Sequence, residues 1–240
     1  MRLDKYLSDM GAGTRSELKK LIRQGHVTVD GAVVRDPGAA VTTDSAVTCR
    51  GVAVAYETFV YYMLNKPAGV ISASEDSREQ TVVDLIDEPV RRDLFPVGRL
   101  DRDTEGLLLI TNDGALAHRL LSPKHHVDKV YEAEVRGIVT SEMIKAFHDG
   151  LTLPDGLVCL PADLEVLDTA EGGPEEARSR VRVTIREGKF HQIKRMFLAV
   201  GSEVLALKRL SMGPLRLDPA LSAGAWRRLT EEEIRTLQQL

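Results

Sequence analysis

Four charged residues stand directly before a short aliphatic segment in the middle of the chain. They are Arg99, Asp101, Arg102 and Asp103, and the segment is residues 107–110. A short aliphatic segment bounded by turn residues predicts a buried strand, so the charged side chains should lie on a loop at one end of a sheet. Reactive groups are common on loops that a rigid scaffold holds. A carboxylate there could act as a base or nucleophile, or it could simply shape a turn.

The cysteines and histidines predict neither a disulfide nor a metal site. Cys49 and Cys159 stand far apart, outside any C-x-x-C pair, and are expected to be two buried thiols. His125 and His126 are neighbours, and neighbouring side chains of a strand point to opposite faces. No cysteine or carboxylate at ligand spacing completes a site. His191 is expected in the core or behind the reactive residues.

The charge of the chain is unevenly distributed. The net charge is −4, but residues 1–35 carry seven Lys and Arg against four Asp and Glu, a local charge of +3. Residues 186–216 carry seven Lys and Arg against two Asp and Glu, a local charge of +5. Basic surfaces of this kind can bind an anionic polymer such as nucleic acid, and each one alone fits an ordinary solvated face equally well.

The hydropathy of the chain predicts no membrane segment. The longest uninterrupted aliphatic run is residues 107–110, far below the roughly 20 apolar residues that a membrane helix needs. The first residues, MRLDKYLSDM, lack the continuous apolar stretch of a secretory signal. We therefore expect a cytoplasmic protein.

Residues 1–55 predict a small module of two helices and a hairpin. Apolar residues recur at helical spacing in the first helix. The second helix opens with a capping box formed by Thr14 and Glu17 and closes at Gly25. Valines then alternate with polar residues on both sides of a turn at residues 30–31.

Residues 59–240 predict one larger domain of the α+β class. Strands are predicted over residues 59–64, 107–110, 129–135 and 179–186. Helices are predicted over residues 116–121, 143–147 and 193–200, and a last helix is predicted from Thr230, capped by Glu233.

The N-terminal module resembles a known RNA-binding motif. The stretches RLDKYL, TRSELKKLI and GHVTVDGAVV follow one another and resemble the alpha-L motif of a small-subunit ribosomal protein and of several RNA-modifying enzymes. In that family the second helix and the hairpin face RNA. The resemblance implies that Arg15, Lys19, Lys20 and Arg23 lie near phosphates, which position a protein on RNA without reading its sequence.

The remainder resembles a family of RNA-modifying enzymes. GRLDRDTEGLLLITNDG, residues 98–114, is similar to the signature of the pseudouridine synthases of the RsuA and RluB/E/F type. Three further stretches agree in order: YMLNKPAGV at residues 62–70, SPKHHVDKVYEAEV at 122–135 and EGKFHQIKRMF at 187–197. The resemblance implies a catalytic domain over residues 59–240, built on a mixed, largely antiparallel sheet with flanking helices. It also implies an isomerase without cofactor or metal.

The resemblance gives roles to three residues in particular. Asp101 stands where the family has its catalytic aspartate, to which attack on the sugar or proton abstraction from it is assigned. Lys194 stands where a basic partner keeps that carboxylate ionised; Arg195 is about 100° away on a helix, so only one of the two should face inward, and Lys194 is the expected one. Tyr131 stands where the family has the tyrosine of a K-x-Y motif, and the ring of that tyrosine stacks on the target base. The other pocket residues expected are Arg99, Leu100 and Leu207.

The remaining basic residues are expected to contact the RNA. They are Arg2, Arg15, Lys19, Lys20, Arg23, Lys66, Lys124, His125, Arg195, Lys208 and Arg209. The implied partner is ribosomal RNA or a pre-ribosomal particle, and the chain is expected to act as a monomer.

The motifs leave two ribosomal RNAs as possible substrates. MRLDKYL, DEPV at residues 87–90, SPKHH, and WRRLTEEEI at residues 226–234 are most similar to the RsuA branch, which acts on small-subunit (16S) ribosomal RNA. A synthase for large-subunit (23S) ribosomal RNA is the alternative. Two other classes remain: a non-catalytic RNA-binding factor of ribosome assembly, and a glycosidase that hydrolyses the base away.

Overall fold

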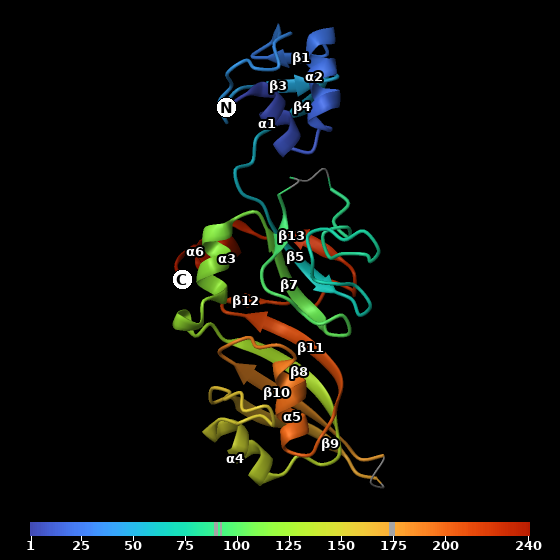
Figure 1. Ribbon diagram of the computed structural model, residues 1–240, viewed down its shortest axis with the longest axis vertical. Helices are drawn as coiled ribbons and strands as arrows, with labels where there is room; N and C mark the ends of the chain where they lie inside the picture. Colours follow the sequence, from blue (N-terminus) through green and yellow to red (C-terminus); the bar gives the residue numbers. More distant parts are fainter. Residues whose placement is uncertain (89–90, 92, 173–175) are drawn as a thin grey trace. The chain divides into compact units, whose positions relative to one another are not determined.

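The computed structural model describes residues 1–88, 91, 93–172 and 176–240, and it divides into two compact units (Figure 1). The first unit consists of Met1–Val60, Ile86–Phe95 and Thr111–Asp113. The second consists of Tyr61–Leu85, Pro96–Ile110 and Gly114–Leu240. No helix among the described residues is long and apolar enough to cross a membrane.

The first unit packs two helices on a four-stranded sheet. The helices are α1 (Leu3–Asp9) and α2 (Arg15–Gln24), and the strands, in the order β2-β1-β3-β4, are β1 (Val27–Val29), β2 (Ala32–Val33), β3 (Val47–Cys49) and β4 (Val52–Val54). Apolar side chains of both helices, β1 and β3 form one core. The predicted capping box of Thr14 and Glu17 is confirmed, and α2 ends at Gly25, whose φ of 84° favours glycine.

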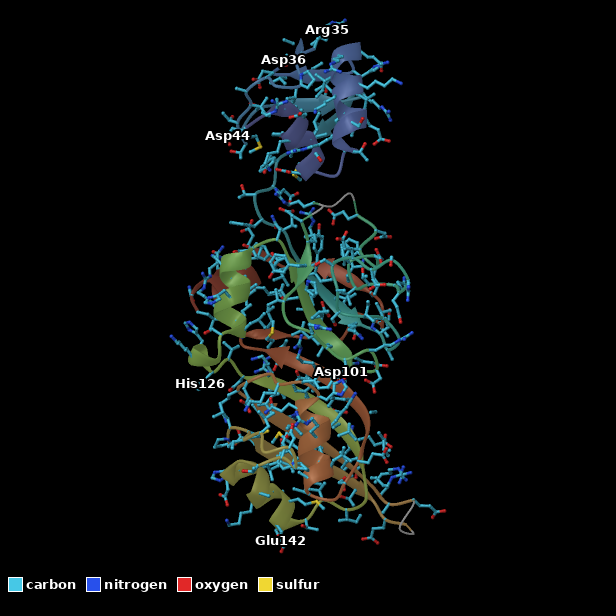
Figure 2. All side chains as sticks on the ribbon, in the orientation of Figure 1. Arg35, Asp36, Asp44, Asp101, His126 and Glu142 are labelled. Carbon is cyan, nitrogen blue, oxygen red and sulfur yellow. The ribbon has the colours of Figure 1, made fainter. Side chains whose placement is uncertain are left out.

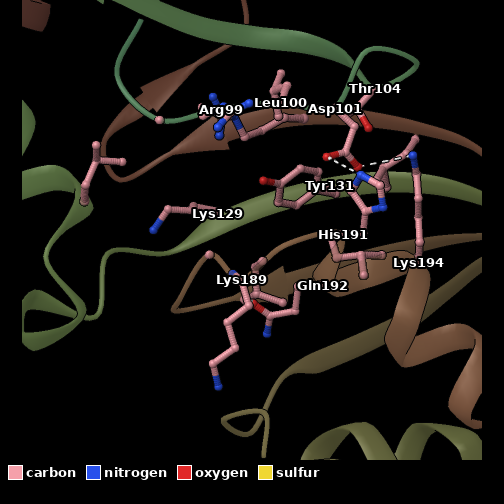
Figure 3. Close-up of a pocket in the computed structure, with 17 residues that line it drawn as sticks. Arg99, Leu100, Asp101, Thr104, Lys129, Tyr131, Lys189, His191, Gln192 and Lys194 are labelled. Atoms are coloured by element: carbon pink, nitrogen blue, oxygen red, sulfur yellow. Dashed lines mark hydrogen bonds and ion pairs between the residues drawn. The ribbon is translucent and has the colours of Figure 1, made fainter. Parts of the chain in front are cut away.

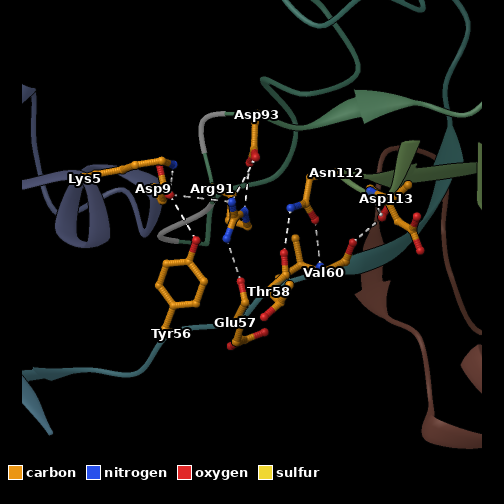
Figure 4. A network of polar contacts seen from close by, with 11 residues as sticks. Lys5, Asp9, Tyr56, Glu57, Thr58, Val60, Arg91, Asp93, Asn112 and Asp113 are labelled. Carbon is orange, nitrogen blue, oxygen red and sulfur yellow. Dashed lines mark hydrogen bonds and ion pairs between the residues drawn. The ribbon is translucent and has the colours of Figure 1, made fainter. Parts of the chain in front are cut away.

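A polar network joins distant segments within the first unit (Figure 4). Arg91 is buried and donates to both carboxylate oxygens of Asp93, at 2.8 and 2.9 Å, and to the carbonyl of Glu57 at 2.7 Å. Its guanidinium also lies 4.0 Å from Asp9, which accepts a hydrogen bond from the hydroxyl of Tyr56 at 3.0 Å. Because each group meets a partner, the network holds the backbone near Glu57 in place.

The second unit is built on a mixed sheet in the order β13-β5-β7-β11-β8-β10-β9, with β6 paired to β7 and β12 to β11. Its strands are β5 (Tyr61–Lys66), β6 (Phe95–Pro96), β7 (Glu105–Thr111), β8 (Lys129–Arg136), β9 (Asp163–Ala170), β10 (Arg178–Ile185), β11 (Val204–Met212), β12 (Leu215–Arg216) and β13 (Trp226–Arg228). β7 and β11 run parallel, whereas β11–β8, β8–β10, β10–β9 and β13–β5 are antiparallel. The prediction of an α+β fold with a mixed, largely antiparallel sheet is confirmed.

Four α-helices and one short 3-10 helix accompany this sheet. They are α3 (Gly114–Leu121), the 3-10 helix η1 (Pro123–His125), α4 (Ser141–Asp149), α5 (Gln192–Ala199) and α6 (Glu231–Gln238). α4 contacts β9 and α5 contacts β11. The rings of Phe147 and Phe197 lie 4.9 Å apart between α4 and α5. α5 is therefore held against the sheet, with its first residues at the end of β10.

Several sequence predictions need correction or extension. The strand predicted from residue 59 begins at Tyr61, and the strands β3, β4, β6, β9, β11, β12 and β13 were not predicted. β9 alternates polar and apolar residues over its first four positions only, and its second half is mostly exposed, so the pattern is too short to predict the whole strand. His126, labelled in Figure 2, has φ 46° after η1, so the two neighbouring histidines do not lie in a strand. Cys49 and Cys159 are both buried free thiols, as predicted.

Candidate active site

Asp101 lies on the loop between β6 and β7, and the segment after β5 holds that loop. The hydroxyl of Ser72 donates to the carbonyl of Leu100 at 2.8 Å and accepts from the amide of Leu100 at 3.1 Å. The amide of Gly69 donates to the carbonyl of Arg102 at 2.7 Å. The stretch NKPAGV and the stretch GRLD thus form one structural unit, in which the backbone on both sides of Asp101 is fixed.

Lys66 fixes the same loop from inside the protein. Its side chain has no exposed surface, and its ammonium donates to the carbonyls of Pro67 at 3.0 Å, Arg102 at 3.2 Å and Thr104 at 2.9 Å. Burial lowers the pKa of Lys66 to about 8, against the attraction of the carboxylates of Asp103 and Asp101. The predicted contact of Lys66 with RNA is wrong, because its charge is used to hold the loop.

Two basic side chains of the second unit reach the carboxylate of Asp101 (Figure 3). The ammonium of Lys194 lies 3.2 Å from one carboxylate oxygen, and Nε2 of His191 lies 3.4 Å from the other. Both residues stand at the start of α5, which the sheet and α4 hold in place. The predicted inward position of Lys194 is therefore what the structure shows, and the contact of His191 is one that the sequence did not reveal.

Lys194 is shared between two carboxylates. It lies 2.6 Å from Asp103, which is 73% exposed, as well as 3.2 Å from the less exposed Asp101. Burial alone would lower the pKa of Lys194, but the hydrogen bonds to Asp103 and Asp101 outweigh it, so the pKa is raised. The hydrogen bond from Lys194 also lowers the pKa of Asp103. An ammonium that stays charged is thus fixed beside Asp101.

All six residues predicted to be catalytic or to line the pocket do line a single pocket. They are Arg99, Leu100, Asp101, Tyr131, Lys194 and Leu207. Figure 3 shows the ring of Tyr131 below Asp101, with Lys129 on one side of it and His191 on the other. Tyr131 is only 7% exposed and stands on β8 opposite Arg209 of β11. An aromatic ring next to a reactive carboxylate is suited to hold a flat base.

The pocket carries an excess of positive charge. Its lining includes five Lys and Arg, whereas Asp101 is the one carboxylate among the described residues that line it; the five are Arg99, Lys129, Lys189, Lys194 and Arg209. Burial, and then the charge of Arg209, lower the pKa of Lys129. A concave site with this charge favours an anionic ligand such as a nucleotide.

Gly106 allows two strands to meet closely behind the pocket. It has φ 101°, and a Cβ atom at this position would lie 2.2 Å from the carbonyl oxygen of Arg209. Any other residue would push β7 away from β11, so glycine is required here. Arg209 is 2% exposed and donates from Nε to the carbonyl of Leu107 at 2.8 Å. Arg209, predicted to contact RNA, is therefore not an exposed surface cation; it is buried and forms part of the lining of the pocket.

The turn that carries His191 is built on two buried polar residues. Nε2 of Gln192 donates to Oε1 of Glu187 at 2.7 Å, and the same oxygen accepts the amide of Leu160 at 2.9 Å. The amide of Lys189 donates to Oε1 of Gln192 at 3.0 Å. His191 itself has a left-handed backbone with φ 47°, a strained conformation that is frequent at functional sites. Glutamate and glutamine at this spacing gave no sequence signal for such a turn.

The other residues predicted to contact RNA fall into two groups. Arg2, Arg15, Lys19, Lys20, Arg23, Lys124 and His125 are exposed. Lys208 is partly buried on β11, and Arg195 is also partly buried, forms an ion pair with Asp155 and donates to the carbonyl of Phe190 at 3.3 Å. Arg195 thus points away from Asp101, as predicted, but its charge is already matched within the protein.

Known proteins resemble the chain over its whole length. Residues 60–199 match the family model described as RNA pseudouridylate synthase, and residues 1–47 match the family model of the S4 domain. An uncharacterized RNA pseudouridine synthase of Bacillus subtilis is 48% identical and covers 100% of this chain and 99% of its own. The ribosomal small subunit pseudouridine synthase A of Vibrio cholerae is 40% identical, with 99% of both chains covered.

A large-subunit enzyme and a solved structure are also similar. The ribosomal large subunit pseudouridine synthase B of Bacillus subtilis is 38% identical and covers 100% of this chain and 96% of its own. A crystal structure of a pseudouridylate synthase matches with a TM-score of 0.68 and 36% identity, over 99% of both chains. The resemblance inferred from the four ordered motifs is confirmed. The chain belongs to the RNA pseudouridylate synthase family, as an RNA isomerase of the RsuA and RluB type with an S4 domain in its N-terminal part.

Proposed function

We propose that the protein converts one uridine of small-subunit (16S) ribosomal RNA to pseudouridine, with Asp101 as its catalytic carboxylate. The observation that carries the proposal is the carboxylate of Asp101 between Lys194 and His191, above the ring of Tyr131. The relatives named as small-subunit enzymes support the choice of 16S RNA. A relative named as a large-subunit enzyme makes 23S ribosomal RNA the second candidate.

The reaction requires a carboxylate and a held base. The bond between ribose C1′ and uracil N1 breaks, the base turns, and a bond forms between C1′ and C5. The hydrogen on C5 then leaves as a proton, and N1 takes up a proton. The carboxylate of Asp101 either attacks C1′ or removes a proton from the sugar. Carboxylates attack the same kind of sugar carbon in retaining glycosidases. The atoms balance between uridine and pseudouridine, and nothing is oxidised or reduced.

The pocket residues divide the other tasks. Lys194 keeps a positive charge 3.2 Å from a carboxylate oxygen of Asp101, where it holds and orients that carboxylate. Tyr131 stacks on the target base after the base has left its helix, and this stacking repays part of the few kcal/mol that unstacking costs. Arg99, Leu100 and Leu207 enclose the base.

The N-terminal module adds affinity for RNA. We propose residues 1–55 as the RNA-binding module and residues 59–240 as the catalytic domain. The exposed cations of α2, namely Arg15, Lys19, Lys20 and Arg23, contact phosphates together with Arg2, Lys124, His125 and Lys208. Contacts of this kind are independent of sequence and weaken with salt.

Tritium release tests the proposed function directly. Transcripts of both ribosomal RNAs and their precursor particles are labelled with tritium at uracil C5, and the purified protein is added. We expect release of tritium from small-subunit RNA and a pseudouridine at one mapped position. Release from large-subunit RNA alone would favour the second candidate. Absence of release from every substrate would contradict the isomerase, and free uracil without release would indicate hydrolysis.

A further inference from the structure

One aromatic side chain stands in solvent beside the pocket. Phe190 is 75% exposed, and its ring stacks on the imidazole of His191 with centroids 3.8 Å apart and planes 19° apart. His191 lines the pocket and reaches Asp101 with its Nε2 at 3.4 Å. One imidazole therefore touches the reactive carboxylate with its edge and supports an exposed aromatic ring with its face.

The backbone that presents Phe190 is rigid. Arg195 donates to the carbonyl of Phe190 at 3.3 Å, and the amide of Arg195 donates to the carbonyl of His191 at 3.0 Å. On the other side, Lys189 is bound through its amide to Gln192, which is 4% exposed and hydrogen-bonded to Glu187. An exposed ring on such a turn is pre-organised, so little freedom is lost when it binds a ligand.

Folding gives no reason for this arrangement. An exposed phenylalanine forgoes the burial that stabilises proteins, and the left-handed backbone of His191 is a conformation that residues other than glycine rarely adopt. Strain of this kind persists where the surroundings impose it and is often linked to function. Phe190 and His191 hence form a small flat platform at the edge of the pocket.

We propose that the exposed face of Phe190 stacks on the nucleobase next to the target uridine. This inference rests on the proposed function and identifies a second base-binding position in the same site. When the target leaves its stack, its neighbour loses one stacking partner, and an aromatic face can replace it without regard to base identity. Lys189 and Arg195 stand on either side of the ring in the sequence, but Lys189 is paired with Glu187 and Arg195 with Asp155, so the flat ring itself carries the proposal.

A protein partner is the competing occupant. Val158 is 65% exposed, and its carbonyl accepts a hydrogen bond from Lys189, so a second apolar side chain lies near this turn. Flat aromatic support by His191 favours a base, because stacking depends on ring geometry, whereas a protein surface would accept any apolar side chain at position 190. Variants that separate aromatic from apolar character therefore decide between the two.

The experiment uses four variants of the full chain. Phe190→Ala removes the ring, Phe190→Leu keeps an apolar side chain, and Phe190→Trp keeps a flat aromatic face. Leu198→Ala is the matched control, because Leu198 is a 61% exposed apolar residue on α5, the helix that follows the turn of Phe190, and does not line the pocket. Kinetics are measured by tritium release on the naked ribosomal transcript that the wild type converts.

We expect Phe190→Ala and Phe190→Leu to lower kcat/KM by about tenfold or more, with kcat at saturating RNA unchanged. Phe190→Trp and Leu198→Ala should behave as the wild type. If Phe190→Leu had the kcat/KM of the wild type, the proposal would be overturned. A decrease of kcat in Phe190→Ala and Phe190→Leu, with KM unchanged, would overturn it as well. A loss seen on precursor particles and absent on naked RNA would assign the ring to a protein contact instead.

A binding measurement keeps the proposal separate from turnover. A short oligouridine with one 2-aminopurine is titrated with each protein, because stacking on an aromatic ring quenches the fluorescence of this base. The wild type and Phe190→Trp should quench more strongly than Phe190→Ala and Phe190→Leu at saturation. Equal quenching by all of them would overturn the proposal. This result does not depend on isomerisation, so it stays informative if the tritium assay contradicts the proposed function.

Discussion

The basic residues of α2 and those around the pocket are held in opposite ways. Along α2, the side chains of Arg15, Lys19, Lys20 and Arg23 are exposed to solvent. In the second unit, Lys66 binds three carbonyls, Arg209 binds the carbonyl of Leu107, and Lys194 bridges two carboxylates. The charges of α2 are available to a partner, whereas the charges around the pocket bind groups within the protein.

The difference teaches that positive charge has two separate uses in this enzyme. On the proposed function, the exposed charges of α2 attract an RNA backbone, and such contacts depend strongly on salt concentration. The buried or half-buried charges of Lys66 and Lys194 hold the loop of Asp101 in place, and on the proposed function this geometry sets the rate of the chemical step. Substitutions in the second set should therefore change kcat, and substitutions on α2 should change affinity.

Removal of the central carboxylate is the most severe test of this distinction. Asp101→Asn should lower kcat by roughly 10³-fold or more, because an amide is neither a base nor a nucleophile here. Lys194 keeps Asp103 as a partner, so RNA affinity and the thermal midpoint should change little. Tritium release and equilibrium binding measure the two effects.

Asp103→Asn is the matched control, since Asp103 binds the same ammonium and lies two residues further on. It should keep most of the activity. A larger loss in Asp103→Asn than in Asp101→Asn would show that the exposed carboxylate carries the chemistry.

The next largest effect on kcat is expected for Lys194, the ammonium that contacts both Asp101 and Asp103. Lys194→Met leaves Asp101 with His191 as its one basic contact among the described residues, and kcat should fall on the order of 10²-fold. Lys194→Arg keeps the charge and should recover most of the rate. Equal loss in both variants would mean that the shape of Lys194 matters more than its charge.

Lys66 tests whether a charge that RNA cannot reach still controls turnover. Lys66→Met removes the donor to the carbonyls of Arg102 and Thr104, so the loop of Asp101 should loosen and kcat should fall roughly tenfold. RNA affinity should remain unchanged. A fall in affinity with normal kcat would return Lys66 to the group of RNA contacts.

The same variant gives a pH dependence with a defined sign. The pKa of Lys66 is about 8 in the folded protein, whereas an unperturbed lysine, as in the unfolded chain, has a pKa of 10.5, so between these values the unfolded chain binds more protons. The free energy of unfolding should then rise with pH in this window, by up to about 3 kcal/mol from Lys66. Denaturant titrations near the two ends of this window measure the free energy of unfolding of the wild type and of Lys66→Met. The wild-type value minus the variant value should rise with pH. A difference that is independent of pH would contradict the buried charge.

The sequence predicted the α-helices of the described residues and the central residues of the site, but fewer than half of the strands. The capping boxes at Thr14 and Thr230 are local signals, and both occur in the structure. Asp101, Tyr131 and Lys194 were identified because each belongs to a motif, and their meeting in one pocket depends on strand order that no local pattern contains. The short strand β13 lacked a periodic signal, and the strand β9 alternates over only its first four residues.

The errors arose where charge was equated with exposure. Lys66 belongs to the motif YMLNKPAGV and Arg209 to the basic stretch of residues 186–216, and both were assigned to RNA. Both are buried because carbonyl groups of neighbouring segments receive their hydrogen bonds. Those segments are distant in sequence, so composition and spacing could not identify them. The contact of His191 with Asp101 was missed for the same reason.

The smallest effect on turnover is expected on α2. Lys19→Gln combined with Arg23→Gln removes two exposed charges four residues apart on one helical face. The dissociation constant for RNA should rise, and the slope of its logarithm against that of salt concentration should fall by about 1.4 if both residues contact single-stranded phosphates. At saturating RNA, kcat should equal that of the wild type. Lys145→Gln on α4, which removes an exposed charge paired with Asp149, is the control and should leave the slope unchanged. A change in kcat without a change in slope would place α2 among the charges that act on the chemistry, and the distinction between the two sets would fail.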